Sequence, residues 1–333
     1  AAAGEIPMIY RWRNGGYPMK KYLPLAASLA SATLFGLALL FIKQGMAVVN
    51  QDTIKFLAFR FTTGFVVMTL LLLFKVQKVD YAGKPIGLLL LCGLLNPLIS
   101  QILETTSTSY APTSLIACVS SITPILVVVL SVLINKDPLP SKMQMAFMGV
   151  TVLGVFVVNF VGRDLSGATG IGMALIFAAV VTIAFNRTFV RRAGRHFTSF
   201  ETVYLTTGMG ALGFSIETVI MHAMRGDLPH FFDGLWNKDF IISVLYMGIG
   251  SCVLAFLFMT YSLAHLPIAI STSTSTVSTV ISILAGVLIL HEPFRWVDVA
   301  GVALILGGVF GLSYCYSKES APAAPAPEEE AQS

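Results

Sequence analysis

The stretch Asn135–Leu139 (NKDPL) closes a long apolar run, and 155 residues later Leu290–Phe294 (LHEPF) closes another. Each run opens just after a proline, Pro112 in the first case and Pro267 in the second. Each copy of this pattern contains five hydrophobic segments, so the second copy must enter the membrane from the opposite side. Inverted-topology repeats of this kind are common among secondary transporters. The repeat therefore points to transport before any single residue does.

Further matches support the repeat upstream, at an offset of 144 residues. Thr62–Gly64 (TTG) returns as Thr206–Gly208, and Lys43 corresponds to Arg187. The two copies thus agree from their first span to their fourth, which favours an internal duplication over a chance match.

The composition is that of a membrane protein. Hydrophobic residues make up 56% of the 333 residues, charged residues 11%, and the mean hydropathy is +0.80. Soluble domains are about 25% charged, so this chain has too little polar surface to cover itself in water. Apolar stretches of about 20 residues are candidate transmembrane helices. We expect ten of them, at 22–42, 54–74, 86–108, 111–134, 143–162, 168–186, 199–223, 239–264, 267–290 and 296–316.

The predicted fold is an all-α membrane protein with ten transmembrane helices in two inverted five-helix repeats. The first repeat covers 22–162 and the second 168–316, between a basic N-terminal segment, 1–21, and an acidic, Pro- and Ala-rich tail, 317–333, that we expect to be disordered. Fourteen of the 21 Lys and Arg residues fall on the side of the N-terminus. This bias predicts both termini in the cytoplasm of a multi-pass inner (plasma) membrane protein. A cleavable signal peptide is not expected.

Two prolines predict interrupted helices. Pro97 follows Asn96 within the third span, and Pro124 lies in the middle of the fourth. Each lacks an N–H and frees a carbonyl, so each is expected to bend or break its helix. Broken helices are tolerated in a membrane where protein or a water-filled cavity satisfies the freed groups. The third and fourth spans are therefore candidates to line a cavity.

The ninth span carries an unusual run of hydroxyls, Ser271–Thr279 (STSTSTVST), with eight hydroxyls in nine positions. Small residues allow close helix packing, and hydroxyls can bond to the preceding turn. A different face of the same helix could line a polar passage, and both interpretations stay open. The matching stretch of the first repeat, Ala117–Pro124, is also small and polar, at the depth where transporters of this design bind substrate.

Three ionisable residues lie within predicted spans, where burial of charge is costly and usually functional. Arg60 and Glu104 lie at similar depths in antiparallel helices, which predicts an ion pair. Alternatively, Glu104 carries a proton or binds a cationic group. Glu217 can pair with His222 or Lys238, or extend to the membrane interface.

Other polar residues have structural explanations. Lys43 and Arg187 end the first and sixth spans, where long basic side chains snorkel to the interface. Thr198 and Glu201 form a predicted capping box. Glu292 is expected to cap or anchor the turn into the tenth span.

Several motif matches are dismissed. Gly208–Gly213 fits GxGxxG, but it lies inside an apolar helix without a preceding strand, so helix packing is favoured. Gly307 and Gly311 form a GxxxG pair that predicts a helix contact. The four cysteines show neither zinc nor disulfide spacing and are expected to be buried and inert: Cys92, Cys118, Cys252 and Cys315. We expect no metal, no cofactor and no catalytic residue.

The chain resembles the drug/metabolite transporter superfamily in its EamA-type, ten-span branch. The resemblance covers nearly all of 22–316. It rests on Phe35-Gly36, Lys43, Leu57–Phe61, Lys136-Asp137, Tyr261–Ala264, Leu288–Glu292, Gly301 and Gly307-Gly308. A Glu after the fourth helix of a repeat is typical of this branch. The first repeat departs by having Asp137 there, and Glu104 stands where an aromatic residue is expected.

The resemblance implies a cavity lined chiefly by spans 1, 3, 4, 6, 8 and 9, with spans 5 and 10 at the periphery. Members move small metabolites such as amino acids, and related branches move nucleotide sugars or sugar phosphates. The candidate lining residues are Gln44, Gln101, Glu104, Ser121, Thr123, Asn186, Tyr261, Ser275 and Thr276.

We therefore predict a secondary transporter for a small polar metabolite, such as an amino acid or amine, that works by alternating access, with proton coupling as one option. The alternatives are a sugar-phosphate or nucleotide-sugar exchanger, a membrane enzyme acting on lipid-linked substrates, and a structural or signalling protein. The expected partners are the substrate and membrane lipid, without nucleic acid, in a monomer or weak homodimer.

Overall fold

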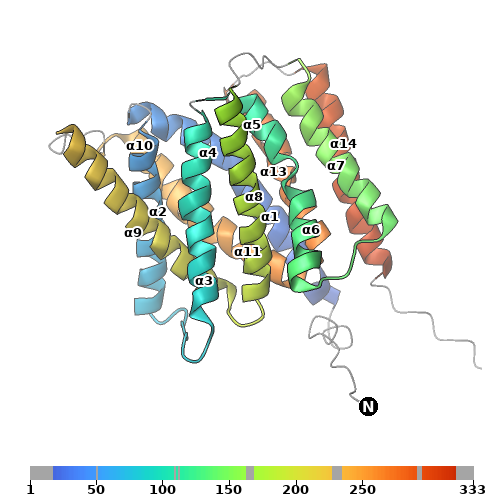
Figure 1. The fold of residues 1–333 in the computed structure, drawn as a ribbon, viewed down its shortest axis with the longest axis horizontal. Helices are drawn as coiled ribbons and strands as arrows, with labels where there is room; N and C mark the ends of the chain where they lie inside the picture. Colours follow the sequence, from blue (N-terminus) through green and yellow to red (C-terminus); the bar gives the residue numbers. More distant parts are fainter. Residues whose placement is uncertain are drawn as a thin grey trace, which may run out of the picture.

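The computed structural model describes residues 18–49, 52–108, 110–111, 113–162, 169–226, 235–290 and 295–319. Within these ranges the secondary structure is helical, and nine helices are long and apolar enough to cross a membrane. The interrupted fourth span completes the predicted ten. The prediction of an all-α membrane protein is confirmed (Figure 1).

The helices of the first repeat are α1 (Pro18–Val48), α2 (Thr53–Leu73), α3 (Ile86–Gly93), η2 (Leu94–Ile99), α4 (Ser100–Thr108), α5 (Thr113–Ser120), α6 (Thr123–Asn135) and α7 (Lys142–Phe160). Those of the second are α8 (Gly170–Ala193), α9 (Ser199–Arg225), α10 (Lys238–Leu245), η4 (Tyr246–Ala255), α11 (Phe256–His265), α12 (Ile268–Ser275), α13 (Val277–Leu290) and α14 (Trp296–Glu319). In both repeats the third span contains a π-helical segment and the fourth is split in two.

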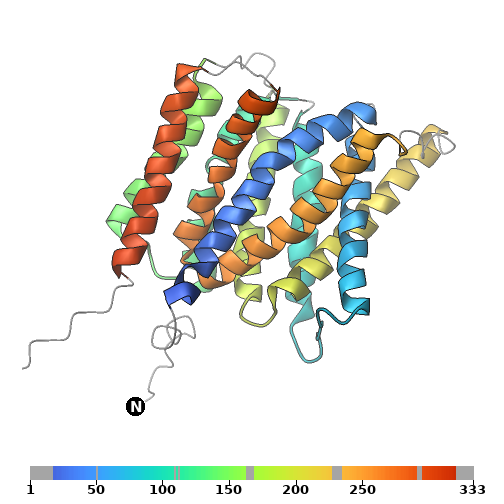
Figure 2. The same cartoon turned by 180° about the vertical axis from the view of Figure 1, so that it is seen from behind.

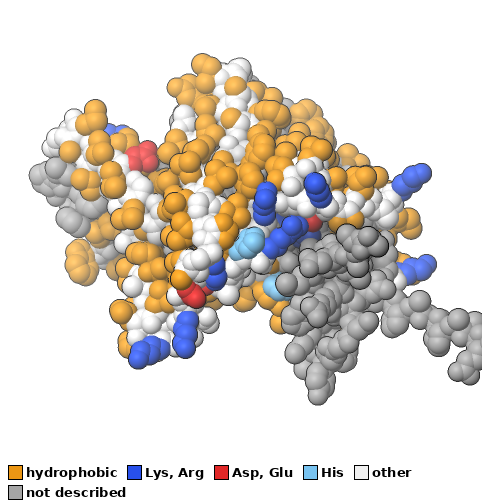
Figure 3. All heavy atoms as spheres, turned by 60° about the horizontal axis from the view of Figure 1, so that its bottom comes forward, with side chains coloured by type: hydrophobic (Ala, Val, Ile, Leu, Met, Phe, Trp, Pro, Cys, Tyr) orange, Lys and Arg blue, Asp and Glu red, His pale blue; other side chains and the backbone are white. Residues whose placement is uncertain are grey.

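One end of the bundle collects basic residues, and we call it the basic end. Its loops and helix ends carry Lys75, Lys78, Lys84, Lys136, Lys142, Arg192 and Arg195. Figure 3, which turns this end forward, shows Lys and Arg side chains spread across it. Helix α1 begins here, whereas α8, the first helix of the second repeat, begins at the opposite end (Figures 1 and 2). The second repeat is therefore inverted.

The two repeats interlock through their first helices. Helix α1 packs against α10 to α13 of the second repeat, and α8 packs against α3 to α6 of the first. Helix α2 packs against α9, and α7 against α14 at one edge of the bundle (Figure 1). The centre of the molecule is thus built from third and fourth spans of both repeats, each contacted by the first helix of the other.

The contact between α7 and α14 differs from the predicted GxxxG face. A side chain at Gly301 would collide with Val158, and one at Gly308 with Thr151, whereas Gly307 has open space around it. The prediction was wrong for Gly307 because α14 is rotated so that Gly301, Gly308 and Gly311 share the contact. These spans form a peripheral pair, as the resemblance implied.

The loop between α2 and α3 is fastened to the start of α9. Thr198 and Glu201 form the predicted capping box, and Glu201 also accepts from Lys84 at 2.8 Å and from the backbone N–H of Asp80 at 3.0 Å. The Tyr81 hydroxyl donates to the Glu201 carbonyl at 2.9 Å. Burial, together with the Glu201 carboxylate, raises the pKa of Tyr81, so its hydroxyl remains a donor. Glu201 is structural.

Some expectations concern residues outside the described ranges. These are residues 1–17 of the N-terminal segment, the tail beyond residue 319, Pro112, the side chain of Cys118 and Glu292. Cys92 and Cys252 are buried free thiols, as expected, while Cys315 is only half-buried.

Candidate functional site

The fourth span breaks at matching positions in the two repeats. In the first, α5 ends at Ser120 and α6 begins at Thr123, with Pro124 in its first turn. In the second, α12 ends at Ser275 and α13 begins at Val277. Thr276, at this second break, stands 155 residues after Ser121. The two breaks are therefore equivalent positions in the two repeats. Helix α6 packs against α12, which brings the fourth span of the first repeat against the fourth span of the second.

The hydroxyls around these breaks donate to their own backbone. Thr123 Oγ1 donates to the Ser120 carbonyl, Ser275 Oγ to Thr272, and Thr276 Oγ1 to Ser273, each at 2.6 Å. Such bonds to the preceding turn satisfy carbonyls that the break leaves free. Each of these hydroxyl oxygens still has lone pairs, so it can accept a hydrogen bond from a ligand.

Arg187 lies inside the protein, and the prediction that it snorkels to the interface was wrong. Its Nη1 donates to Ser275 Oγ at 3.3 Å, across to the broken span. Arg187 lies six residues before the end of α8, roughly 9 Å at about 1.5 Å per residue. Helix α8 packs among the spans of the first repeat, which turns this side chain inward. No salt bridge to Arg187 occurs in the described part of the chain, so this half-buried cation bonds to a neutral hydroxyl oxygen.

Arg60 and Glu104 lie in the half of the bundle that is away from the basic end. Arg60 is buried on α2, with its guanidinium 4.8 Å from the centre of the Phe61 ring, and its Nε has no hydrogen-bond partner. Glu104 is half-buried on α4 and is attracted electrostatically by Arg60. No salt bridge joins Arg60 to Glu104 among the described residues. The predicted ion pair is therefore present only as a longer-range attraction.

Glu217 is half-buried on α9 and has no ion-pair partner within the described ranges. Of the three alternatives for Glu217, the pairing with His222 does not occur among the described residues. His222 Nε2 and Arg225 Nη1 both face Asp52 Oδ2, each at 3.7 Å, and thereby fasten the end of α9 to the start of α2. Nor does Lys238 reach Glu217.

Two other candidates make their contacts with residues other than Arg187. Gln44 donates to Asp239 at 3.0 Å near the carboxyl-terminal end of α1, where this hydrogen bond joins α1 to α10. The Tyr261 ring lies against the tilted ring of His265 where α11 reaches the basic end, with ring centres 4.2 Å apart. Neither contact places these side chains at the breaks in the fourth spans.

The remaining candidates lie on interior helices. Asn186 is buried and donates to the Cys92 carbonyl at 2.8 Å, a group freed where the backbone leaves helical geometry at Asn96. Gln101 is half-buried on α4, and Ser121 is buried at the first break.

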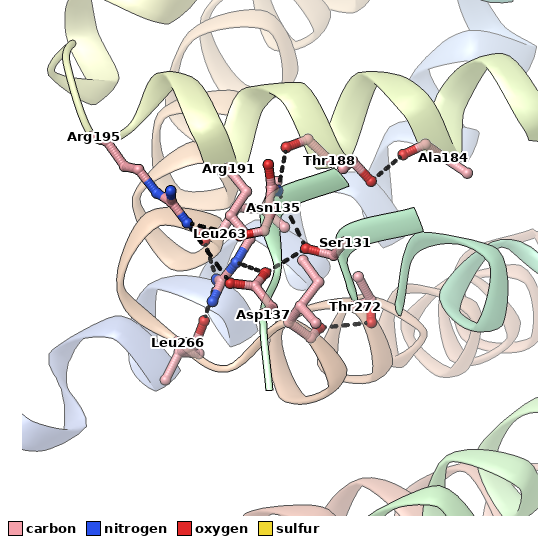
Figure 4. Close-up of polar contacts among 11 residues, drawn as sticks. Ser131, Asn135, Asp137, Ala184, Thr188, Arg191, Arg195, Leu263, Leu266 and Thr272 are labelled. Atoms are coloured by element: carbon pink, nitrogen blue, oxygen red, sulfur yellow. Dashed lines mark hydrogen bonds and ion pairs between the residues drawn. The ribbon is translucent and has the colours of Figure 1, made fainter. Parts of the chain in front are cut away.

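A buried ionic network lies at the basic end of the bundle (Figure 4). It was not predicted from the sequence. Arg191 Nε donates to Asp137 Oδ2 at 2.6 Å, and its Nη1 donates to the carbonyls of Leu263 and Leu266 at 2.7 and 2.6 Å. The side chains of Arg191 and Asp137 are only 6% and 3% exposed. One ion pair therefore joins the end of α6, in the first repeat, to α8 and the α11–α12 turn in the second.

Neighbouring groups complete the network. Ser131 Oγ donates to Asp137, Asn135 Nδ2 donates to the Thr188 carbonyl at 3.0 Å, and the half-exposed Arg195 lies 3.9 Å from Asp137 Oδ1. The sequence contains one indication that Arg191 shares the environment of Arg187. The two arginines are four residues apart, which places them on one face of α8.

These features define a membrane transporter, because two inverted helical repeats enclose polar and charged groups at broken spans. The chain belongs to the EamA-like transporter family, whose model matches residues 23–160 and 170–314, once for each repeat. The predicted resemblance is confirmed.

Relatives support the same class. An uncharacterized transporter of Bacillus subtilis (strain 168), YcxC, is 26% identical over 295 residues, covering 88% of this chain and 94% of the relative. A second from that strain, YetK, is 26% identical over 311 residues, covering 90% of each. An uncharacterized transporter of Archaeoglobus fulgidus is 23% identical over 296 residues, covering 88% of this chain and 98% of the relative.

A solved structure, described as a crystal structure of a protein, shares the fold. Its TM-score is 0.72 at 17% identity, and the match covers 88% of this chain and 98% of the other. At this identity the likeness concerns the fold alone.

Proposed function

We propose that the protein is a secondary transporter for a small metabolite that carries a carboxylate, such as an amino acid. The observation that supports this most is Arg187, a cation inside the membrane domain that bonds to a neutral hydroxyl at the broken fourth span. A guanidinium presents a planar fork of N–H donors that matches a carboxylate.

An amino acid also supplies an ammonium group, and acceptors stand close by in the fold. The hydroxyls of Ser275 and Thr276 have used their hydrogens on the backbone, so their lone pairs can accept from an ammonium. One arginine and several acceptors favour a zwitterion over a phosphate ester, which would need more than one positive charge.

The Asp137–Arg191 pair serves as the closure on the basic end. It lies one helical turn beyond Arg187 on α8 and connects elements of both repeats. In alternating access one repeat moves against the other around a fixed site, and this movement must separate Asp137 from Arg191. We place the basic end in the cytoplasm because cytoplasmic loops carry an excess of Lys and Arg.

A ligand screen tests the proposal. A ligand that binds the folded state raises its apparent stability, so detergent-purified protein is heated with amino acids, amines, nucleosides, sugars and sugar phosphates. We expect amino acids or other small carboxylates to raise the melting temperature. Stabilisation by sugar phosphates, with no response to carboxylates, would instead favour the exchanger, and turnover of a lipid-linked compound would favour an enzyme.

Glu104 is the proposed proton carrier. We expect uptake of the ligand into proteoliposomes to depend on a pH gradient, and Glu104→Gln to abolish this dependence, because an amide cannot exchange a proton. Glu217→Gln is the matched control, since Glu217 is also a half-buried carboxylate within a span. An unchanged gradient dependence in Glu104→Gln would reduce Glu104 to a charge partner of Arg60.

A further inference from the structure

A small cavity lies at the kink of the third span, apart from the Arg187 side chain. Its volume is about 20 Å³, room for a single water or small ion. It is bounded by η2 from the first repeat and by α8, α9 and α11 from the second. Its polar lining consists of Asn96, Asn186, Thr202, Thr206 and Thr260, and the rest is apolar.

Three of these side chains have already used a donor elsewhere. Thr202 Oγ1 donates to the Thr198 carbonyl at 3.1 Å, and Thr206 Oγ1 to the Thr202 carbonyl at 3.0 Å. Asn186 Nδ2 donates to the Cys92 carbonyl. The polar surface that they leave for the cavity is therefore rich in oxygen lone pairs.

Asn96 supplies an acceptor without a partner. Its Oδ1 is buried and makes no hydrogen bond. Leaving a buried acceptor unsatisfied is costly, so an occupant that the protein itself does not provide is indicated. Asn96 is also the residue at which the third span leaves helical geometry, so the half of the span before it ends there, and the carboxyl-terminal end of a helix carries the negative pole of its dipole.

Five neutral side-chain oxygens, those of Asn96, Asn186, Thr202, Thr206 and Thr260, thus border a space that holds one atom, and oxygen ligands suit a hard cation. Asn96 Nδ2 and the Thr260 hydroxyl can also donate, so water is the competing occupant that the titration below distinguishes. Divalent ions prefer carboxylates, and no cluster of three or more His, Cys, Asp or Glu residues occurs in the described ranges. The neighbouring charges are engaged elsewhere, since Arg187 bonds to Ser275 and Glu201 to Lys84.

We propose that this cavity binds one monovalent alkali cation, with Na⁺ as the ion of suitable size. The cation stabilises the contact between the kinked third span of one repeat and three helices of the other. Discontinuous helices of transporters coordinate Na⁺ through the carboxyl ends of half-helices. This site takes no part in recognising the carboxylate substrate, so each can be tested without the other.

The test titrates NaCl against choline chloride at constant ionic strength and records the melting temperature of the purified full chain, with KCl in parallel. We expect a saturable rise with Na⁺, and at least a tenfold higher half-saturating concentration in Thr206→Val and Thr260→Val. Thr182→Val is the matched control, because its hydroxyl likewise bonds to its own helix, at the Ala178 carbonyl, but does not line the cavity.

A second variant keeps the test decisive if the valine variants do not fold. Asn96→Asp retains the oxygen and adds a negative charge, so it is expected to lower the half-saturating concentration of Na⁺ at least tenfold. A response to Na⁺ no greater than that to choline, or one that none of the lining variants alters, would show that the cavity holds water and would overturn the proposal.

Discussion

Asp137→Asn is expected to destabilise the protein strongly and to open its basic end. The substitution leaves Arg191 buried without its counter-ion, and removing one partner of a buried pair typically costs about 3–5 kcal/mol. Thermal unfolding in detergent should show a markedly lower melting temperature. In a background without the native cysteines, Thr272→Cys, buried beside the network (Figure 4), should react faster with a membrane-impermeant maleimide.

Two controls distinguish this closure from a general loss of stability. Arg195→Gln should have little effect, because that side chain is 48% exposed and 3.9 Å from Asp137. The double variant Asp137→Asn with Arg191→Gln should recover part of the lost stability, because it removes the unpaired charge, while its maleimide reactivity stays high. If Asp137→Asn keeps the melting temperature and the maleimide reactivity of the wild type, the Asp137–Arg191 pair does not close the basic end.

Arg187→Gln is expected to weaken substrate binding and transport about 10- to 100-fold. A hydrogen bond to a charged group contributes about 1.5–3 kcal/mol, and about 1.4 kcal/mol corresponds to a factor of ten. Arg187→Lys should be intermediate, since it keeps the charge but loses the planar fork. Ser275→Ala should cost less, because it removes only the neutral partner of Arg187.

Uptake into proteoliposomes, with binding measured by thermal shift, provides the test. Arg192→Gln is the matched control, since Arg192 lies on the same helix but is exposed at the basic end. If Arg187→Gln binds the carboxylate as tightly as the wild type does, Arg187 serves only to hold Ser275 and the proposed substrate class is wrong.

Much of the architecture could be predicted, because its causes are local in the chain. Apolar length determines which segments span a membrane, and an odd number of spans per copy determines the inversion. The fourth span was expected to break near Pro124, and the structure places the break at Ser121–Ile122, because proline cannot continue the ladder of backbone hydrogen bonds.

The charged groups could not be placed in this way. The sequence predicts that Arg187 snorkels to the interface and counts Arg191 only among the 14 basic residues on the side of the N-terminus. In the structure Arg187 lies at the broken span and Arg191 pairs with Asp137. A long basic side chain near a helix end can extend to water or inward with almost the same backbone. Its direction depends on which neighbour covers which face of the helix.

The sequence by itself determined the number of spans, their inversion, the breaks at Pro97 and Pro124 in the first repeat and the family, since these follow from composition, spacing and local backbone chemistry. Only the tertiary structure decided that α8 is inserted among the spans of the other repeat. That insertion turns Arg187 towards Ser275, joins Arg191 to Asp137 and forms the cavity at Asn96. Each contact joins residues more than 50 positions apart or from different repeats, so no local pattern could specify it.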